Sequence, residues 1–430
     1  MTANNTMLRD QNKINELLLF FLRSDTNPKN FQIKDISDSN WDGFVQESIR
    51  QRIGGLLYQR LKSLPPDNGI PSRVIQELRQ QYFDTALRNM QLFHELHKVL
   101  EALQESDVSV IVLKGAYLAQ GVYGNIALRS MGDVDILVRK EDFAKAEQML
   151  LDRGYSFDEQ YGERDWYLNN HYHLLYRRPE NGVNIELHWD ITSPSSPFEI
   201  DVERLWERAQ LVTIAGAQVL VFSAEDLILY LCLHLSYHHT FEYFAMRSLY
   251  DVNEILLYYC DNFDWWQLQE LARKWSATNS AFLTLYLARE LLGATVPEAV
   301  LKDLEPQNID PRFIHWAEER MFIIKDTQEA TQKPSLSGRF ARVYTSQGLA
   351  SKISAFLLTL FPPLETMAEL YSLQSDSTRI YFYYPVRLLD VFRSFTSIGW
   401  QLLRGDQKII AWIDSEGKRS ALKDWLTPQN

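Results

Sequence analysis

The N-terminal part of the chain carries apolar side chains at spacings of three and four, a pattern typical of amphipathic helices. This spacing runs through INELLLFFL, FVQESIRQRIGGLLYQRL and VIQELRQQYFDTALRNMQLFHELHKVLEALQ. It places the apolar positions on one face of each helix and the polar positions on the other. We therefore expect residues 1–106 to form an N-terminal helical region.

A different pattern begins at residue 107. Residues 108–113 are short, apolar and β-branched and end at a glycine turn, which is typical of a buried strand. Residues 132–138 alternate polar and apolar side chains and predict a second strand, with a short helix at AYLAQGVYG between the two. Further strands are expected at HYHLLYRR and VNIELHWDI, joined by a turn that contains an Asn-Gly pair. The pattern predicts a small mixed-sheet α+β core over residues 107–222.

Helical spacing returns at Ser223, where a serine followed three residues later by Asp226 forms a capping box. Amphipathic or buried helices are then expected at SAEDLILYLCLHLSYHH, SLYDVNEILLYY, WWQLQELARKW and SAFLTLYLARELLG. The most apolar window, residues 353–364, is shorter than the ~20 residues that span a bilayer. We expect it to be a buried core helix or an interfacial segment, and we expect no membrane span. The core is thus embedded between the N-terminal helices and a C-terminal helical region, residues 223–430.

Charge and cysteine content exclude several classes of protein. The chain has 44 basic and 56 acidic residues and a net charge of -12, the wrong sign for a protein that binds a phosphate backbone. General nucleic-acid binding is therefore not expected.

Cys232 and Cys260 lie in apolar helical segments without a CxxC motif, which favours neither a disulfide framework nor a structural zinc site. The first residues lack the pattern of a secretory signal, so a cytoplasmic location is expected.

The candidate chemistry starts with Asp133 and Asp135 in the alternating segment, because a period of two places both carboxylates on one face of a strand. Two close carboxylates repel each other and bind a proton more tightly unless a cation neutralises them. Mg²⁺ takes such hard oxygen ligands and completes its shell with water and phosphate. A D-x-D pair is more often simply solvated, so the spacing alone leaves both interpretations open.

Three neighbouring features favour a metal and phosphate site. Lys114 and Gly115 end one strand and open a helix, where a cation and backbone N–H groups could face a triphosphate. Arg129 lies four residues before Asp133 and could reach phosphate oxygens. Glu186 lies on a later predicted strand of the same sheet. It could be the third carboxylate that positions a second cation and activates a hydroxyl nucleophile.

Two segments together resemble the uncharacterised bacterial nucleotidyltransferase family of the polymerase β superfamily, namely LKGAYLAQGVYGNIALRSMGDVDILV and NIELHW. They match its L-K-G strand end, its arginine before D-x-D and its acid-Leu-His-Trp strand. The resemblance implies that Asp133 and Asp135 bind metal and that Glu186 is the third metal-site or base carboxylate. It also implies that Gly115 marks the phosphate-binding turn, that NTP is the substrate and that two Mg²⁺ ions act during turnover.

The phosphate-binding turn departs from the wider superfamily. That superfamily commonly has Gly-Ser or Gly-Gly at this turn, whereas the present chain has Gly115 followed by Ala116. The hydroxyl that would contact the β and γ phosphates is therefore missing. Lys114 could supply charge in its place, as the L-K-G pattern of the family implies.

Histidines and a further charged pair admit several interpretations. His234 and His238 are four residues apart on one predicted helix face, and His239 follows, a spacing that can hold a metal. They are more often core or hydrogen-bonding residues, and the resemblance also suggests a place in the nucleotide or acceptor cleft. His188 should share a strand face with Glu186 and could orient a carboxylate or acceptor. Another pair four residues apart, Arg247 and Asp251, could be an exposed helix pair.

Three functions compete. The leading one is an Mg²⁺-dependent nucleotidyltransferase that moves a nucleoside monophosphate from NTP to a hydroxyl on a small molecule, peptide or protein. The alternative is a catalytically silent nucleotide-binding or scaffold protein of the same fold. A metal-dependent phosphohydrolase is less favoured, because the sequence shows no clustered H-D pair.

Overall fold

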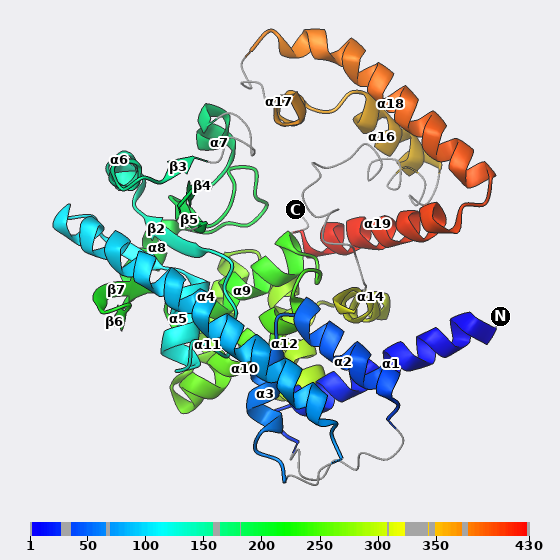
Figure 1. Cartoon of the computed structure of the whole chain (residues 1–430). Helices are drawn as coiled ribbons and strands as arrows, with labels where there is room; N and C mark the ends of the chain where they lie inside the picture. Colours follow the sequence, from blue (N-terminus) through cyan, green and yellow to red (C-terminus); the bar gives the residue numbers. More distant parts are fainter. Residues whose placement is uncertain are drawn as a thin grey trace. The chain divides into compact units, whose positions relative to one another are not determined.

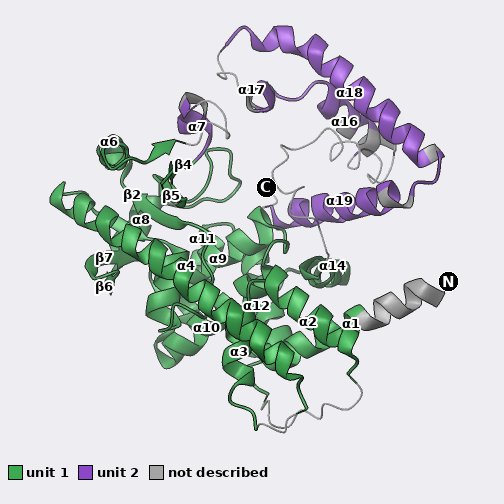
Figure 2. Ribbon diagram, in the orientation of Figure 1, with its two compact units in different colours: residues 1–158, 172–322, 428–430 green, residues 159–171, 323–427 purple. Residues whose placement is uncertain are grey.

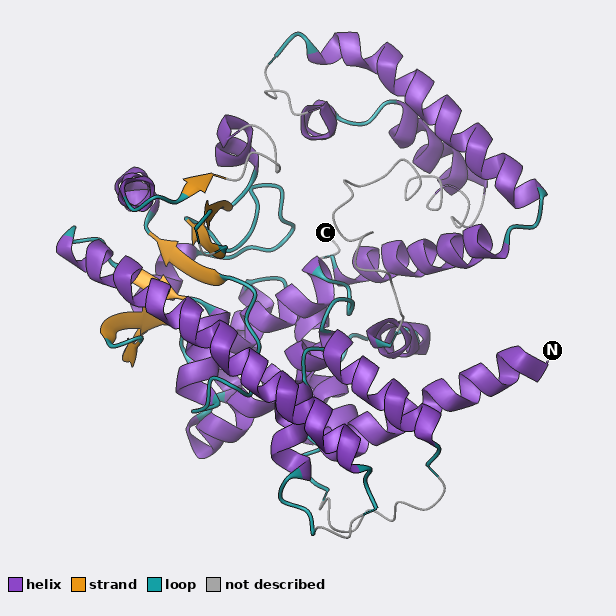
Figure 3. Cartoon of the chain, viewed as in Figure 1, coloured by secondary structure: helices purple, strands orange, loops and turns teal. Residues whose placement is uncertain are grey.

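The computed structural model describes residues 2–26, 36–65, 69–157, 164–180, 182–307, 309–322, 343, 349–371 and 377–427. This described part of the chain is mostly helical, with a seven-stranded mixed sheet flanked by N- and C-terminal helices (Figure 3). It confirms the predicted α+β class. Contacts divide the chain into a first unit, residues 1–158, 172–322 and 428–430, and a second unit, residues 159–171 and 323–427 (Figure 2). The three-region boundaries expected from the sequence stay a prediction.

Helices precede the sheet in the first unit, as the apolar spacing predicts. Within the described residues they are α1 (Thr2–Leu22), α2 (Asp38–Arg50), α3 (Gly54–Leu61) and α4 (Ser72–Glu105). The long helix α4 packs against α2 and α3 and also against the strands β5 and β7 (Figure 1). It thereby links the N-terminal helices to the sheet.

The seven strands form one sheet with the order β3-β4-β5-β2-β1-β7-β6. They are β1 (Val110–Val112), β2 (Val134–Val138), β3 (Ser156–Phe157), β4 (His173–Arg178), β5 (Val183–His188), β6 (Gln210–Ile214) and β7 (Ala217–Val221). The central strand β2 is parallel to β5 and antiparallel to β1. Every residue of β1 and β2 is buried, and each large apolar side chain there contributes about 1.5–3 kcal/mol. The sequence predicted β1, β2, β4 and β5 but not β3 or the β6–β7 hairpin.

Further helices belong to the first unit. They are α5 (Lys114–Tyr117), α6 (Phe143–Asp152), α8 (Val202–Arg208), α9 (Ala224–Leu233), α10 (Ala245–Tyr259), α11 (Trp265–Lys274), α12 (Thr278–Leu292), α13 (Glu298–Leu304) and α14 (Pro311–Met321). Those at α5, α9, α10, α11 and α12 agree with the predicted segments. Two π-helical turns, η2 (Leu118–Val122) and η5 (His234–His238), extend α5 and α9. The capping box is confirmed, because the Ser223 hydroxyl accepts a hydrogen bond from the Asp226 amide at the start of α9.

The second unit is helical where it is described. Its helices are α7 (Arg164–Asn170), α16 (Leu349–Leu360), α17 (Leu364–Tyr371), α18 (Ile380–Leu403) and α19 (Gln407–Leu426). Helix α16 covers most of the apolar window, and the expectation of a buried core helix was wrong. Ile353, Leu357 and Leu358 are each about half exposed, because α16 packs against α18 along one side. None of the described helices is long and apolar enough to cross a bilayer.

Candidate active site

Three carboxylates lie together on one face of the sheet. Asp133 directly precedes β2, Asp135 lies within β2, and Glu186 lies on the parallel strand β5. Asp135 and Glu186 are register partners, and register partners on neighbouring strands project from the same face. All three line one cavity. The register of β2 and β5 therefore adds the third carboxylate to the pair that the sequence singles out.

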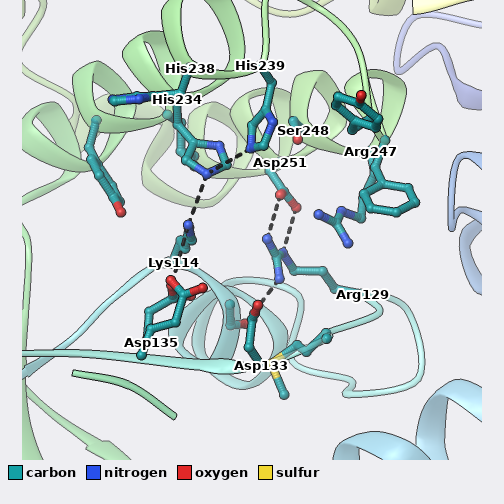
Figure 4. A pocket seen from close by; sticks show the side chains of 18 of the residues that line it. Lys114, Arg129, Asp133, Asp135, His234, His238, His239, Arg247, Ser248 and Asp251 are labelled. Carbon is teal, nitrogen blue, oxygen red and sulfur yellow. Dashed lines mark hydrogen bonds and ion pairs between the residues drawn. The ribbon is translucent and has the colours of Figure 1, made fainter. Parts of the chain in front are cut away.

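The cavity has a volume of about 330 Å³. The sheet face with the carboxylates forms one wall, and side chains from η5 and α10 form the opposite wall (Figure 4). The loop of residues 129–132, which leads into β2, also lines it. This volume falls within the ~300–1,000 Å³ that small-molecule sites usually occupy.

Lys114 lies between the two walls. Its ammonium is 3.5 Å from Asp135 Oδ1 on the sheet side and 3.0 Å from His234 Nε2 on the helix side (Figure 4). Burial acts to lower the pKa of Lys114, but Asp135 and other nearby groups raise that pKa overall. Burial and then the Lys114 charge lower the pKa of His234 well below its usual value. A charged ammonium thus donates a hydrogen bond to a neutral imidazole, and its contact with a phosphate stays a prediction.

Arg129 forms a buried, two-pronged ion pair with Asp251 on α10. Its Nε and one terminal nitrogen each donate to a carboxylate oxygen at 2.9 Å, and its other terminal nitrogen lies 3.4 Å from the Gly115 carbonyl. Arg129 is 4% exposed and Asp251 1% exposed. The interpretation of Asp251 as part of an exposed helix pair was wrong, because this face of α10 turns towards the sheet. Arg129 therefore connects the glycine turn to α10.

The loop that carries Arg129 is fixed from two sides. Asn89, fully buried on α4, donates hydrogen bonds to the carbonyls of Ile126 at 2.5 Å and Arg129 at 2.7 Å. Arg247 on α10 donates to the Ser130 carbonyl at 3.0 Å. The chain therefore enters β2 along a defined path, which sets the position of Asp133.

The carboxylates have the properties that a hard divalent cation requires. Burial and then the charge of Asp135 raise the pKa of Asp133. Asp135 Oδ1 is buried and accepts no hydrogen bond from the described residues; the Lys114 ammonium and His188 Nε2 each lie 3.5 Å away. A bound cation would relieve the repulsion and supply the missing partner. These carboxylate oxygens are therefore suitable ligands for Mg²⁺. The bound magnesium itself stays a proposal.

Two imidazoles lie beside Glu186. His188 Nε2 is 3.4 Å from Glu186 and 3.5 Å from Asp135, and His173 Nε2 is 3.9 Å from Glu186. His173 and His188 are register partners on β4 and β5, so they share the face of Glu186. Burial raises the pKa of Glu186, but His188 lowers that pKa overall. His188 was expected on this face, whereas His173 was missed because the sequence does not give the register of β4.

The histidines after α9 are not arranged on a regular helix face. Residues 234–238 form a π-helical turn in which the His239 amide donates to the His234 carbonyl. Such a turn brings residues five apart together, and His234 Nε2 lies 3.3 Å from His239 Nε2. The rings of His234 and His238, which the spacing of four placed on one helix face, have centroids 6.3 Å apart, and a metal role for these histidines stays a prediction. All three histidines do line the cavity.

Three carboxylates clustered in one cavity on a mixed sheet suit metal-assisted phosphoryl transfer. The chain belongs to the family described as "Uncharacterised nucleotidyltransferase", whose family model matches residues 37–293. The match covers more than half of the chain and includes every element that lines the cavity. The family resemblance drawn from the sequence is confirmed.

Parts of the chain are also similar to solved structures of low sequence identity. One similar structure is that of the antibiotic-resistance factor ANT(2'')-Ia, with 16% identity and a TM-score of 0.30, covering 47% of this chain and 96% of that one. Another is an antigenic nucleotidyltransferase-like protein from Paracoccidioides brasiliensis, with 17% identity and a TM-score of 0.30, covering 49% and 96%. No curated protein matches the chain.

Proposed function

We propose that the protein is an Mg²⁺-dependent nucleotidyltransferase that moves a nucleoside monophosphate from NTP to a hydroxyl-bearing acceptor. The observation that carries this proposal is the set of Asp133, Asp135 and Glu186 in one cavity, with Asp135 and Glu186 on neighbouring parallel strands and Asp133 just before the first of them. Membership of a nucleotidyltransferase family supports the use of NTP. The acceptor would be a small molecule, a peptide or a protein.

Asp133, Asp135 and Glu186 would hold the metal, with two ions during turnover. When bound, Mg²⁺ neutralises charge on the phosphates and on the leaving group. Asp135 would contribute an oxygen that has no hydrogen-bond donor among the described residues. Lys114 and His188 would keep this carboxylate oriented, because both lie 3.5 Å from its Oδ1 atom.

In the proposed reaction, the acceptor oxygen forms a bond to the α-phosphorus of NTP. The bond from that phosphorus to the oxygen bridging to the β-phosphate breaks, and pyrophosphate leaves with the electron pair. The acceptor proton passes to the Glu186 carboxylate, which its lowered pKa keeps ionised at neutral pH. His188, 3.4 Å from Glu186, would hold that carboxylate in place.

Glu186→Gln is expected to separate chemistry from binding. The amide keeps the shape of the side chain but cannot take the proton, so turnover should fall by roughly 10²- to 10⁴-fold. NTP affinity should change little, because Asp133 and Asp135 remain to hold the ion that binds the NTP, whereas Glu186 would position the second ion at the acceptor hydroxyl. Turnover is measured as pyrophosphate release, and affinity by titration calorimetry.

Glu207→Gln on α8 is the matched control, since this exposed glutamate pairs with Arg204 outside the cavity. It should behave as wild type in both assays. Undiminished turnover in Glu186→Gln would remove Glu186 from the reaction. Nucleotide binding without turnover in the wild type, with every acceptor, would favour the catalytically silent alternative.

A further inference from the structure

Two arginines line the cavity without a carboxylate within ion-pair distance among the described residues. Arg52 follows α2 and is exposed, and Arg247 lies in the first turn of α10 and is half-buried. One terminal nitrogen of Arg247 donates to the Ser130 carbonyl, but its Nε atom is buried without an acceptor. Figure 4 shows the Arg247 guanidinium on the side of the cavity where Arg129 lies. The two arginines are thus available to a ligand.

Both guanidinium groups lie against one aromatic ring. The guanidinium carbon of Arg52 is 4.0 Å from the centroid of the Phe244 ring, and that of Arg247 is 5.0 Å from it. Aromatic faces attract cations, so the ring stabilises both positions. A shared ring therefore holds two like charges at one end of the cavity.

The other cations of the cavity already have acidic partners in the protein. Arg129 is paired with Asp251, and the Lys114 ammonium lies against Asp135. Burial, and then the charges of Arg129 and other groups, lower the pKa of Arg247 to about 10. A half-buried cation whose charged form is disfavoured gains stability when an anion binds beside it. Positive charge without an ion-pair contact among the described residues is thus concentrated at Arg52 and Arg247.

The backbone that carries Phe244 is strained. Thr240, Phe241, Tyr243 and Phe244 have φ values of 47°, 57°, 48° and 58°, the left-handed region that residues other than glycine seldom adopt. Such strain persists where the surroundings enforce it and is concentrated at ligand sites.

A buried arginine enforces this conformation. Arg320 on α14 donates through Nε to the Thr240 carbonyl at 2.9 Å and forms an ion pair with Glu242. Arg320, Thr240 and Glu242 are all buried. The protein therefore stabilises an unfavourable backbone conformation, and this conformation sets the position of the Phe244 ring.

This cationic end of the cavity borders the metal carboxylates. A Cβ atom placed on Gly132 would lie 3.4 Å from a terminal nitrogen of Arg52, so the guanidinium lies close to the backbone just before Asp133. Arg52 and Arg247 both act electrostatically on Asp133. A triphosphate whose α-phosphate lies at the carboxylates could extend its outer phosphates towards the two arginines.

We infer that Arg52 and Arg247, supported by Phe244, bind the β- and γ-phosphates of the NTP. The inference rests on the proposed function and names residues outside the motif that suggested it. Guanidinium groups present paired N–H donors that match phosphate oxygens. Arg52 and Arg247 thus take the place of the hydroxyl missing from the glycine turn. The N-terminal helices thereby contribute a substrate-binding residue to the site.

The test compares triphosphate with monophosphate binding by full-length Arg52→Gln, Arg247→Gln and the double variant, with Mg²⁺ present. The nucleotide is whichever of the four common NTPs the wild type binds most tightly, together with its monophosphate. Each single variant should lose about tenfold in NTP affinity and the double variant about 100-fold, as charge-assisted hydrogen bonds are lost. Monophosphate affinity should change by less than about threefold, because the missing contacts are to the outer phosphates.

Arg79→Gln is the matched control. The Arg79 guanidinium also lies over a phenylalanine ring, that of Phe83 at 5.5 Å, but outside the cavity. It should bind both nucleotides as the wild type does. Because Arg52 is exposed, Arg52→Gln should fold normally. If Arg247→Gln does not fold, the NTP affinity of Arg52→Gln alone tests the inference.

The outcomes separate the two proposals. Wild-type NTP affinity in the double variant, or in Arg52→Gln if Arg247→Gln does not fold, would overturn the inference and leave the proposed function standing. Equal losses for NTP and its monophosphate would overturn it too. Failure of the wild type to bind any NTP would instead contradict the proposed function, and the inference with it.

Discussion

Asp133→Asn is expected to abolish Mg²⁺-dependent NTP binding without weakening the fold. The amide keeps the size of the side chain but lacks the charge that balances the cation. Because loss of a residue that only supports a metal ligand costs about 10- to 100-fold, loss of the ligand charge should cost more than about 100-fold in affinity. Asp135→Asn should have the same effect on binding.

The stability of the two variants should differ. Burial and Asp135 raise the pKa of Asp133, so its ionised form destabilises the metal-free fold at neutral pH. This loss of stability develops as pH rises above the ordinary pKa of an aspartate, and Asp133→Asn removes it. The melting temperature of Asp133→Asn without Mg²⁺ should therefore equal or exceed that of the wild type. Asp135→Asn should be less stable than the wild type, since Lys114, whose side chain is only 16% exposed, loses its nearest carboxylate.

Calorimetric titration of Mg²⁺-NTP into each variant measures the NTP affinity. The control is Asp84→Asn, an exposed position on α4 that does not line the cavity. Wild-type affinity in both Asp133→Asn and Asp135→Asn would rule out the metal site.

Arg129→Met should produce the largest loss of stability. It would leave the Asp251 carboxylate, which is 1% exposed, without its cation. Breaking a buried pair by removing one partner costs about 3–5 kcal/mol. The free energy of unfolding, measured by urea denaturation, should fall by this amount, and replacing Asp251 with leucine as well should restore part of it.

Arg204→Met is the control for this experiment, because Arg204 forms an exposed pair with Glu207 on α8. Exposed pairs contribute little, so no measurable change is expected. If Arg129→Met were as stable as Arg204→Met, the buried pair would not hold the glycine turn against α10.

The sequence predicted features whose signal is local. The alternation around Asp133 and Asp135 predicted β2, and β-branched residues predicted β1. Glu186 was expected on a later strand of the same sheet, and it lies directly beside Asp135. Each of these expectations depends on a few consecutive residues, so the sequence alone carries the signal that predicts them.

Other features depend on residues that are distant in the chain. Arg129 and Asp251 are 122 positions apart, and no spacing rule connects them. His173 reaches the site through the antiparallel register of β4 and β5. Nothing local indicates that Phe244 adopts a left-handed conformation, because glycine does not mark the position. Tertiary packing decides all three.

Label transfer from NTP tests the central claim most directly. The protein is incubated with Mg²⁺, hydroxyl-bearing acceptors and NTP labelled at either the α- or the γ-phosphate. The account predicts that the α-label joins the acceptor, that the γ-label leaves as pyrophosphate, and that Asp133→Asn does neither. Transfer of the γ-label to the acceptor, its release as orthophosphate, or undiminished transfer by Asp133→Asn would contradict nucleotidyl transfer at this site.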